Sequence, residues 1–215
     1  FKDAGYTEPK FLIPIDGKPM IEHVVDMFDS EDSFHFVLNT IQLSDFPEIP
    51  KLLESLSAKV DLTIIEPHEF GPAYSALQVK NIPLNREVII SYCDFFVDWD
   101  YKLFKRIIYE YDGAIPAFSG FHPASFGNTY YAYMRVNDNN EMVELREKSS
   151  FTSERHMEFA SSGVYYFREW GIFRKYAEML LSKGFGDLKE AYVSLLFNPM
   201  VKDGLKVKVT PVKKF

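Results

Sequence analysis

The hydrophobic positions along this chain change their period several times, and each change marks a new secondary-structure element. Through the first half, short continuous apolar runs, typical of buried strands, alternate with segments whose apolar positions recur at the three-to-four-residue spacing of a helix face. The predicted strands of this half are residues 34–39, 60–65, 87–92 and 113–118. The predicted helices are residues 20–28, 46–57, 74–79 and 101–111. The strand 87–92 is almost entirely apolar at its centre, so we expect it to be fully buried.

The pattern changes after residue 120. Strand-like segments at 130–136 and 142–146 flank the run Asn137-Asp138-Asn139-Asn140, whose residue types are typical of a tight turn between antiparallel strands. One more strand, two helices and a closing strand follow. We predict them at residues 160–167, 171–182, 188–198 and 205–212.

The order of these elements predicts the fold class. Strand, helix and strand in succession require crossover connections, which place consecutive strands parallel in one sheet. We therefore predict an α/β protein: a Rossmann-like three-layer α/β/α sandwich whose mixed, mainly parallel sheet gains an antiparallel hairpin. The 215 residues contain no internal repeat and no low-complexity linker, so we expect a single domain over residues 1–215.

Composition narrows the classes of function. Aromatic residues make up 16% of the chain and 20 of them are Phe, which predicts a core rich in Phe. The net charge of −7 argues against a nucleic-acid partner, because such a surface needs basic residues to replace counterions. Cys93 is the only cysteine, which excludes an intramolecular disulfide and makes a cytoplasmic location the default expectation. No apolar run is long enough to span a bilayer, so we expect no membrane partner, and a homo-oligomer stays open.

The opening segment carries the first candidate chemistry. Pro9 fixes its own backbone and disfavours helix just before it, so Lys10 is expected in an extended segment from which its ammonium can reach a phosphate. A solvated surface lysine is the plain alternative. Gly17-Lys18-Pro19 then predicts a tight turn ahead of the helix that starts at Met20.

Acidic residues follow the strand 87–92. Asp94 comes directly after its C-terminal end, and ligands bind at that edge in open parallel sheets. A carboxylate there suits Mg²⁺, which prefers oxygen ligands and substrate phosphates, although Asp94 could also cap the next loop. Asp98 and Asp100 form an Asp-x-Asp pattern that could hold a metal ion. We interpret Asp100 instead as the N-cap of the helix 101–111.

Three further places combine residue types suited to binding a phosphorylated ligand. Gly71 would let backbone approach a ligand closely, although Gly71-Pro72 also fits an ordinary helix start. Glu147 can accept hydrogen bonds from two hydroxyl groups and Lys148 can bind a phosphate, with a surface ion pair as the alternative. Gly163 lies among small residues of a strand, where a ligand could pack against backbone or the strand could simply bulge.

Taken together and in order, these segments resemble the signatures of the sugar nucleotidyltransferases, also called nucleoside-diphosphate-sugar pyrophosphorylases. The resemblance runs from Glu8 to the end of the chain, and the Tyr92–Phe95 segment is similar to the form found in capsule-associated members. The matching segments are Pro9-Lys10, the Phe70–Leu77 turn, Tyr92-Cys93-Asp94-Phe95, Glu147-Lys148 and Ser161–Tyr165.

The resemblance implies a nucleotide-diphospho-sugar transferase fold of the GT-A-like type and a definite reaction. Such enzymes join a nucleoside triphosphate to a sugar 1-phosphate and release pyrophosphate, without a covalent enzyme intermediate. It implies that Lys10 and Asp94 are catalytic, that Asp94 holds Mg²⁺, and that Lys10 and Lys148 hold the two reacting partners.

The remaining candidate residues also take roles from the resemblance. Gly71 would lie at the base or ribose, Glu147 at the sugar hydroxyls and Gly163 against the sugar. The capsule-associated likeness further implies a role in surface-polysaccharide synthesis.

The chain departs from the family pattern in places. The family's glycine-rich phosphate loop would lie upstream of Phe1 and its second metal aspartate near the C-terminus, so we expect a cut-down domain or part of a longer polypeptide. Pro72 stands where the family often has Thr, which leaves the nucleobase open, and the sugar is open as well.

Three alternatives to this function stay open. One is a metal-dependent glycosyltransferase of the same fold that uses Asp98 and Asp100. The second is a binding module without turnover. The third is a cytidylyltransferase that acts on choline phosphate or another non-sugar phosphate.

Overall fold

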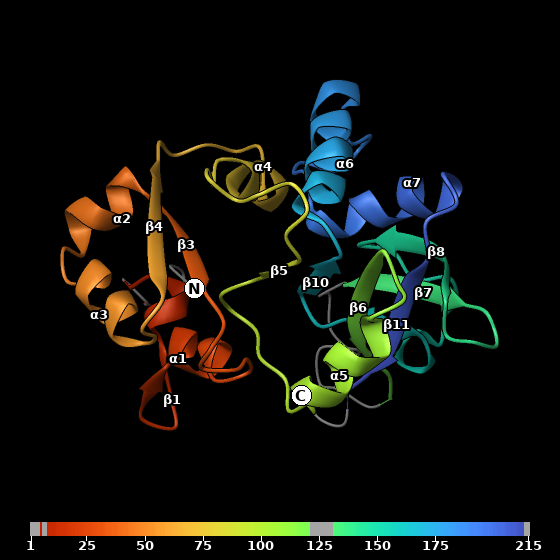
Figure 1. Cartoon of the computed structure of the whole chain (residues 1–215), viewed down its shortest axis with the longest axis horizontal. Helices are drawn as coiled ribbons and strands as arrows, with labels where there is room; N and C mark the ends of the chain where they lie inside the picture. The colour runs from red at the N-terminus through yellow and green to blue at the C-terminus, as the bar shows by residue number, and fades with distance from the viewer. Residues whose placement is uncertain (1–4, 6–7, 121–130, 213–215) are drawn as a thin grey trace. The chain divides into compact units, whose positions relative to one another are not determined.

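A computed structural model describes residues 5, 8–120 and 131–212 of the chain (Figure 1). Contacts group them into two compact units, which we treat one at a time. The N-terminal unit comprises the residues up to His68 together with Ser91–Phe96, and the C-terminal unit comprises Glu69–Ile90 and the residues from Val97 onward. The single domain over residues 1–215 stays a prediction. Within the described residues, none of the helices has the length and apolar character that a bilayer crossing requires.

The N-terminal unit is built on two parallel strands, β3 (Phe34–Asn39) and β4 (Val60–Ile65). Both have the bounds that the sequence predicts. The connection between them contains α2 (Thr40–Asp45) and α3 (Ile49–Ser55), which contact β3 and β4 respectively (Figure 1). The prediction of one helix over 46–57 is therefore wrong at its start, and α2 was not predicted.

A capping box explains the missed helix α2. The Asn39 side chain accepts a hydrogen bond from the Gln42 backbone N–H at 2.8 Å, and the Gln42 side chain accepts one from the Asn39 N–H at 2.9 Å. This reciprocal pair satisfies backbone donors that would otherwise lack partners at the start of a helix. None of the residues of α2 is buried, so no apolar periodicity marked it.

The opening of the chain forms a short hairpin and a helix. The elements are η2 (Lys10–Leu12), β1 (Pro14–Ile15), β2 (Lys18–Pro19) and α1 (Met20–Val25). A tight turn precedes α1 as predicted, but it is formed by Asp16 and Gly17, with φ of 49° and 83°, both left-handed. Lys18 and Pro19, which were predicted to belong to the turn, form β2. In α1, Ile21, Val24 and Val25 are buried, which fixes the helix against the unit's core.

A seven-stranded sheet forms the centre of the C-terminal unit. Its order is β5-β10-β6-β9-β7-β8, and β11 also pairs with β6. The strands are β5 (Val88–Ser91), β6 (Gly113–Phe118), β7 (Ala132–Val136), β8 (Met142–Glu147), β9 (Phe159–Ser161), β10 (Val164–Phe167) and β11 (Val207–Pro211).

This large sheet corrects the prediction of a mainly parallel sheet. Strands β9 and β10 both run antiparallel to β6, and β7 runs antiparallel to β8 and β9, whereas β11 is parallel to β6. The predicted hairpin β7–β8 is confirmed, although Tyr130, where its first strand was expected to begin, lies outside the described residues. The connections that join β7, β8, β9 and β10 contain no α-helix, and β8 and β9 are joined by a loop with the single 3₁₀ turn η4 (Arg155–Met157). Antiparallel strands need no helical crossover between them.

The predicted strand 160–167 is split into β9 and β10 by Ser162 and Gly163. Both halves pair with β6, and Ser162 keeps contact by donating its N–H to the Pro116 carbonyl at 3.0 Å. Gly163 has φ of 75° and its N–H turns to the Ser161 hydroxyl at 3.1 Å. The two residues therefore form a bulge in an otherwise continuous strand.

Strand β5 is less buried than the sequence indicates. All four residues from Val88 to Ser91 are only half-buried, so the prediction of a fully buried strand is wrong. The reason lies in its place in the sheet, because β5 comes last in the strand order and, among the described residues, pairs with β10 alone.

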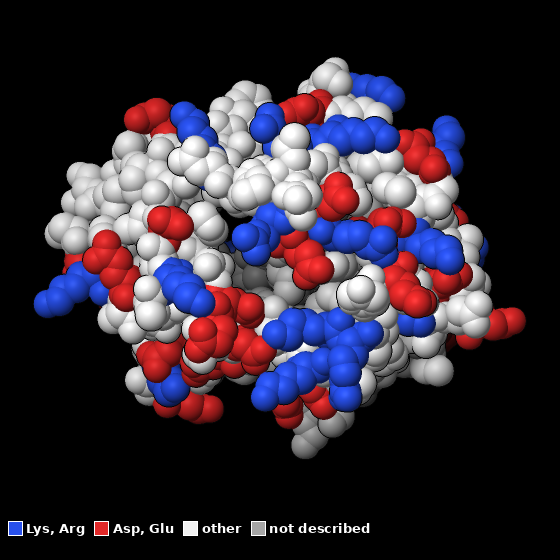
Figure 2. Space-filling model, viewed as in Figure 1, with Lys and Arg blue, Asp and Glu red and all other residues white. Residues whose placement is uncertain are grey.

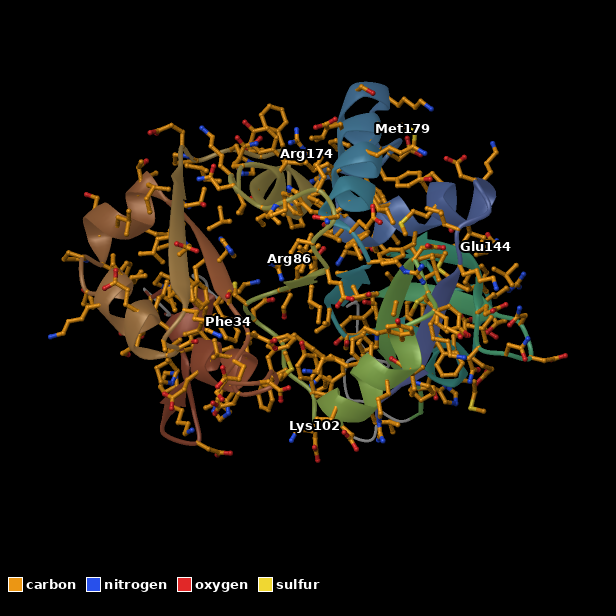
Figure 3. All side chains as sticks on the ribbon, in the orientation of Figure 1. Phe34, Arg86, Lys102, Glu144, Arg174 and Met179 are labelled. Atoms are coloured by element: carbon orange, nitrogen blue, oxygen red, sulfur yellow. The ribbon has the colours of Figure 1, made fainter. Side chains whose placement is uncertain are left out.

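Helices pack on the sheet through aromatic side chains. On β10, Tyr166 contacts Phe104 of α5 (Tyr101–Ile108), whereas Tyr165 and Phe167 contact Phe197 of α7 (Phe197–Lys202). The side chains drawn in Figure 3 fill the space between these elements. The remaining helices of the unit are α4 (Pro72–Leu77), η4 (Arg155–Met157), α6 (Trp170–Lys183) and η5 (Val193–Leu196). The Phe-rich core is therefore found in this unit, while a three-layer arrangement of the whole chain stays a prediction.

Candidate functional site

The N-terminal unit brings Lys10 and Asp94 together although 84 positions separate them in the sequence. The Lys10 ammonium Nζ lies 3.3 Å from Oδ2 of Asp94. Both side chains are open to solvent, with 53% of Lys10 and 40% of Asp94 exposed. A cation and a carboxylate in this state can each exchange their mutual contact for a ligand at low cost, because exposed ion pairs contribute little to stability.

Local structure positions both members of this pair. Pro9 is extended as expected, but Lys10 lies in the single 3₁₀ turn η2, not in an extended segment. The loop that carries Asp94 is attached to α1, because Phe96 stacks on the His23 ring at a centroid distance of 4.8 Å. His23 also has a ring nitrogen 2.8 Å from the Ile15 carbonyl, so it acts as a structural residue of the helix.

The donor set around Asp94 fits Mg²⁺ only in a limited way. Among the described residues, no group of three or more His, Cys, Asp or Glu side chains could hold a metal ion. Mg²⁺ often takes one or two protein carboxylates and completes its shell with water and substrate phosphates, so a single exposed aspartate is compatible with it.

The second predicted pair, Glu147 and Lys148, lies at the end of β8 in the C-terminal unit. Only 5% of the Glu147 side chain is exposed. Ser194 of η5 donates its hydroxyl hydrogen to Oε2 of Glu147, while Lys148 Nζ lies 3.9 Å from Oε1. Burial raises the pKa of Glu147, and the Ser194 hydrogen bond and the Lys148 charge oppose that rise.

Lys148 has an unusual backbone conformation for a residue with a side chain. Its φ is 56°, in the left-handed region, and its N–H donates to the Tyr131 carbonyl at 3.0 Å. Its ammonium lies 5.1 Å from the centre of the Tyr192 ring, close enough for a cation–π contact. Non-glycine residues in this region are strained and cluster at functional sites.

The strand register places Gly163 near the same end of the strands as Glu147 and Lys148. The pairings of β7 with β8 and β9 set Glu147, Ala132 and Ser161 in one row across the sheet. Lys148 follows Glu147 at the end of β8, and Gly163 lies two residues past Ser161 at the end of β9, which runs in the same direction. The three candidate residues of this unit's sheet therefore share one edge.

Gly71 has a structural reason to be glycine, and its role at a ligand stays a prediction. Its φ is 93°, and a Cβ atom at this position would lie 2.7 Å from the Ala191 backbone nitrogen. Two hydrogen bonds join the same segments, from Ala73 N–H to the Ala191 carbonyl at 3.0 Å and from Ala191 N–H to the Phe70 carbonyl at 2.9 Å. The close approach that Gly71 allows is thus to the segment that continues into η5.

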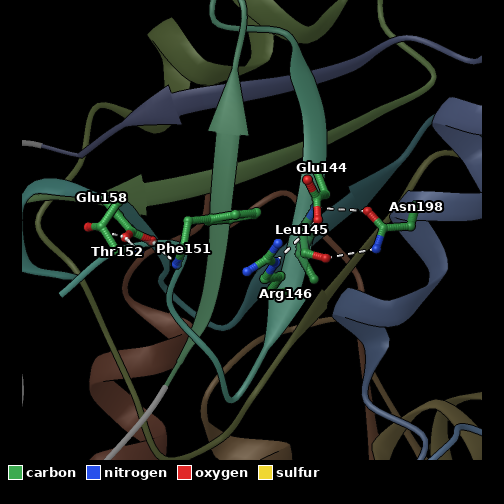
Figure 4. A network of polar contacts seen from close by, with 7 residues as sticks. All are labelled: Glu144, Leu145, Arg146, Phe151, Thr152, Glu158 and Asn198. Carbon is green, nitrogen blue, oxygen red and sulfur yellow. Dashed lines mark hydrogen bonds and ion pairs between the residues drawn. The ribbon is translucent and has the colours of Figure 1, made fainter. Parts of the chain in front are cut away.

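Ser194 and Tyr192 were missed by sequence reasoning, because residues 188–198 were predicted to be one helix. Instead, the first helical turn of this segment is η5, which begins only at Val193, and α7 follows it from Phe197. One signal was available: Ser194 and Asn198 stand as lone polar residues in an apolar run, and buried polar groups need partners. Asn198 finds its partner in Leu145, accepting from its N–H at 2.8 Å and donating to its carbonyl at 2.7 Å (Figure 4).

The loop after Lys148 is fixed by its own contacts. The Phe151 ring lies between the guanidinium groups of Arg135 and Arg146, each 4.4 Å from its centre. The Glu158 carboxylate accepts the backbone N–H of Phe151 at 2.9 Å and that of Thr152 at 2.7 Å (Figure 4). These contacts hold the loop that leaves the candidate edge.

The Asp98-x-Asp100 alternative loses one of its carboxylates to a structural role. Oδ1 of Asp100 accepts the Leu103 N–H at 2.8 Å, which confirms its predicted role as the N-cap of α5. Beyond this cap, Lys102, Lys105 and Arg106 are exposed on α5, and Figure 2 shows the resulting cluster of basic side chains.

Comparisons place the chain among solved structures. No protein-family model and no curated protein matches the sequence. The chain is similar to the nucleoside-diphosphate-sugar pyrophosphorylase of Vibrio cholerae RC9, with a TM-score of 0.75 and 17% identity over 98% of this chain and 86% of that one.

Two further solved structures give the same result. A protein of Bacillus anthracis assigned as a glucose-1-phosphate thymidylyltransferase, in complex with sucrose, has a TM-score of 0.72 and 15% identity over 97% of this chain and 80% of that one. The inositol-1-phosphate CTP transferase of T. maritima has a TM-score of 0.66 and 14% identity over 98% and 80%. The chain therefore has the mixed α/β fold that these nucleotidyltransferases share.

Proposed function

We propose that the chain is a sugar nucleotidyltransferase that joins a nucleoside triphosphate to a sugar 1-phosphate and releases pyrophosphate. The observation that carries the proposal is the fold it shares, over nearly its whole length, with nucleotidyltransferases of phosphorylated sugars and related phosphates. Residues selected from the sequence alone add support, because they form one ion pair in each unit.

In this reaction the protein mainly positions the two substrates and stabilises the negative charge on their phosphates. A phosphate oxygen of the sugar phosphate attacks the α-phosphorus, a new P–O bond forms, and the bond between the α-phosphorus and the bridging oxygen breaks. Pyrophosphate leaves with that electron pair. Lys10 would offset negative charge on phosphate oxygens, and its exposure makes it accessible to them.

Residues of the C-terminal unit would bind the sugar phosphate. Oε1 of Glu147 can accept a sugar hydroxyl, and Lys148 can bind a phosphate oxygen. Gly163, with its left-handed backbone at the same sheet edge, would let the sugar lie against the main chain.

Asp94 would hold Mg²⁺ through its exposed carboxylate. The ion would supply charge neutralisation for the phosphates. The ion pair with Lys10 keeps this carboxylate oriented and the lysine ammonium close to it.

The substrate class has a second candidate and a proposed biological role. Similarity to an inositol-1-phosphate CTP transferase favours a non-sugar phosphate paired with cytidine triphosphate as the alternative. The capsule-associated form of Tyr92–Phe95 leads us to propose a role in surface-polysaccharide synthesis for the sugar-specific case.

The test is pyrophosphate release with Mg²⁺ by the natural polypeptide that carries this sequence. Four nucleoside triphosphates would be combined with a panel of sugar 1-phosphates, inositol 1-phosphate and choline phosphate. We expect turnover with one pair, and a loss of at least about 100-fold in kcat/KM in Asp94→Ala and Lys10→Ala.

Two matched variants control this experiment. Lys18→Ala removes another exposed lysine of the N-terminal unit, paired with Glu22 and Asp26, and should leave turnover unchanged. Glu144→Gln removes an exposed acid three positions before Glu147 on β8 and should do the same. Absence of turnover with every pair, in a protein that binds nucleotide, would reject the proposal in favour of a binding module.

A further inference from the structure

The two carboxylate oxygens of Glu147 have different surroundings. Oε2 accepts the hydroxyl hydrogen of Ser194, which is fully buried. Oε1 lies 3.9 Å from Lys148 Nζ, a distance too long for a hydrogen bond, so this oxygen keeps capacity to accept one from a ligand. One oxygen is therefore held by the protein, and the other faces the lysine at the edge of the sheet.

Ser194 can hold the carboxylate because its own position is rigid. Its neighbours Val193 and Leu196 in η5 are fully buried. The preceding Ala191 is joined to Phe70 and Ala73 by two backbone hydrogen bonds. A serine side chain has only three staggered positions about χ1, so a fixed backbone limits its hydroxyl oxygen to three places.

We propose that Ser194 is a positioning residue that fixes the Glu147 carboxylate and keeps it ionised for the sugar-phosphate ligand. The inference rests on the proposed function, because it assigns Glu147 to that ligand. The physical reason is that a buried carboxylate without partners is costly when charged, whereas a hydroxyl donor favours the charged form.

Other charged and titratable groups also face Glu147 and set its charge balance. Lys148, the next residue along the chain, favours the carboxylate through its positive charge. Tyr192, from the segment that leads into η5, has its pKa raised by burial and then by the charges of Glu190 and Glu147, so it stays neutral near pH 7. Ser194 therefore supplies the one hydrogen bond to Glu147 identified among the described residues.

The test compares Ser194→Ala with the unchanged protein by carbon-13 NMR of glutamate side-chain carboxyl groups during a pH titration. The Glu147 signal is assigned by its loss in Glu147→Gln. We expect the midpoint of its titration to move to higher pH in Ser194→Ala. Ser162→Ala is the matched control, since it removes another buried hydroxyl, which donates to the Pro116 carbonyl at 2.9 Å and not to Glu147.

Kinetics with the productive substrate pair provide the second readout. Ser194→Ala should raise KM for the sugar phosphate about tenfold, with a smaller change in kcat, and move the acid limb of the pH profile upward. Ser194→Thr, which keeps the hydroxyl group, should return the acid limb of the pH profile to its position in the unchanged protein.

The two proposals fail in different ways. An unmoved Glu147 midpoint in folded Ser194→Ala overturns the positioning role, whatever the activity. A shifted midpoint in a protein that turns over no substrate pair supports the positioning role for the carboxylate itself and rejects the proposed reaction.

Discussion

The two acid–lysine pairs of this protein differ in burial more than in chemistry. Lys10 and Asp94 are 3.3 Å apart and both are well exposed, whereas Glu147 is almost fully buried and lies 3.9 Å from Lys148. Water screens the first pair and contributes to the solvation of both charges. The second pair has lost water on the acid side and requires protein partners in its place.

This difference shows how structural support scales with burial. The exposed pair needs only that two loops lie close together, and exposed pairs contribute at most about 1 kcal/mol to stability. The buried acid needs a hydroxyl donor, the donor needs the rigid turn η5, and that turn needs the contact of Ala191 with Gly71. Substitutions at some distance should therefore affect the second pair.

The largest effect is expected at Gly71. Gly71→Ala places a Cβ atom 2.7 Å from the Ala191 nitrogen in a backbone conformation that favours glycine. We expect the free energy of unfolding to fall by about 4 kcal/mol, measured by urea denaturation. Gly184→Ala is the matched control, because its φ of 77° and ψ of 173° are similar and no atom lies within 4 Å of the added Cβ.

The control should lose only about 2 kcal/mol, the cost of the conformation itself. Equal losses in the two variants would show that the Ala191 segment moves aside at little cost, and so does not hold η5 rigidly.

A smaller effect is expected from the strained backbone of Lys148. Both Lys148→Gly and Lys148→Ala remove the ammonium group and should lower sugar-phosphate affinity equally. Glycine tolerates φ of 56°, so Lys148→Gly should be the more stable of the two by about 1 kcal/mol. Thermal and urea unfolding of both variants measure the difference, and equal stability would mean that the main chain relaxes when the side chain is lost.

The smallest effect is a change in how stability depends on pH. Burial raises the pKa of Glu147 in the folded protein, so the folded state binds its proton more tightly than the unfolded state. Stability should therefore fall as pH rises from the ordinary glutamate pKa, about 4.3, through the raised value. In Glu147→Gln that decline is absent, so this variant should become the more stable protein towards neutral pH.

Urea denaturation between pH 4 and pH 8 measures the effect. Asp94→Asn is the comparison from the exposed pair, and its stability should stay within about 1 kcal/mol of the unchanged protein. A Glu147→Gln protein that follows the unchanged protein across the whole range would contradict the assignment of a burial cost to Glu147.

Sequence reasoning located elements well where the apolar pattern is local. Strands β3, β4 and β6 have the predicted bounds, because each is one short, mostly apolar segment. Strand direction in the large sheet could not be predicted in the same way. It depends on which strands meet, and β9 and β10 meet β6 through a bulge that local periodicity does not record.

The residues of the candidate site also differ in whether the local sequence identifies them. Chemistry-bearing residues such as Lys10, Asp94 and Glu147 could be selected from their motifs, and the first two do lie together. Ser194 could not, because its role depends on a contact with Glu147 across 47 positions and on a turn where a helix was expected. Its place as a lone polar residue in an apolar run indicates that it needs a buried partner, but only the tertiary contacts identify that partner as Glu147.

The amide of Asn198 has a consequence for the solubility of the protein. Strand β8 ends the strand order of the large sheet, and Asn198 satisfies both backbone groups of Leu145 just as a neighbouring strand would. A side chain thereby occupies one rung of an edge where a second molecule could add a strand and start an aggregate. Asn198 therefore opposes self-association at β8, the same strand that ends in Glu147.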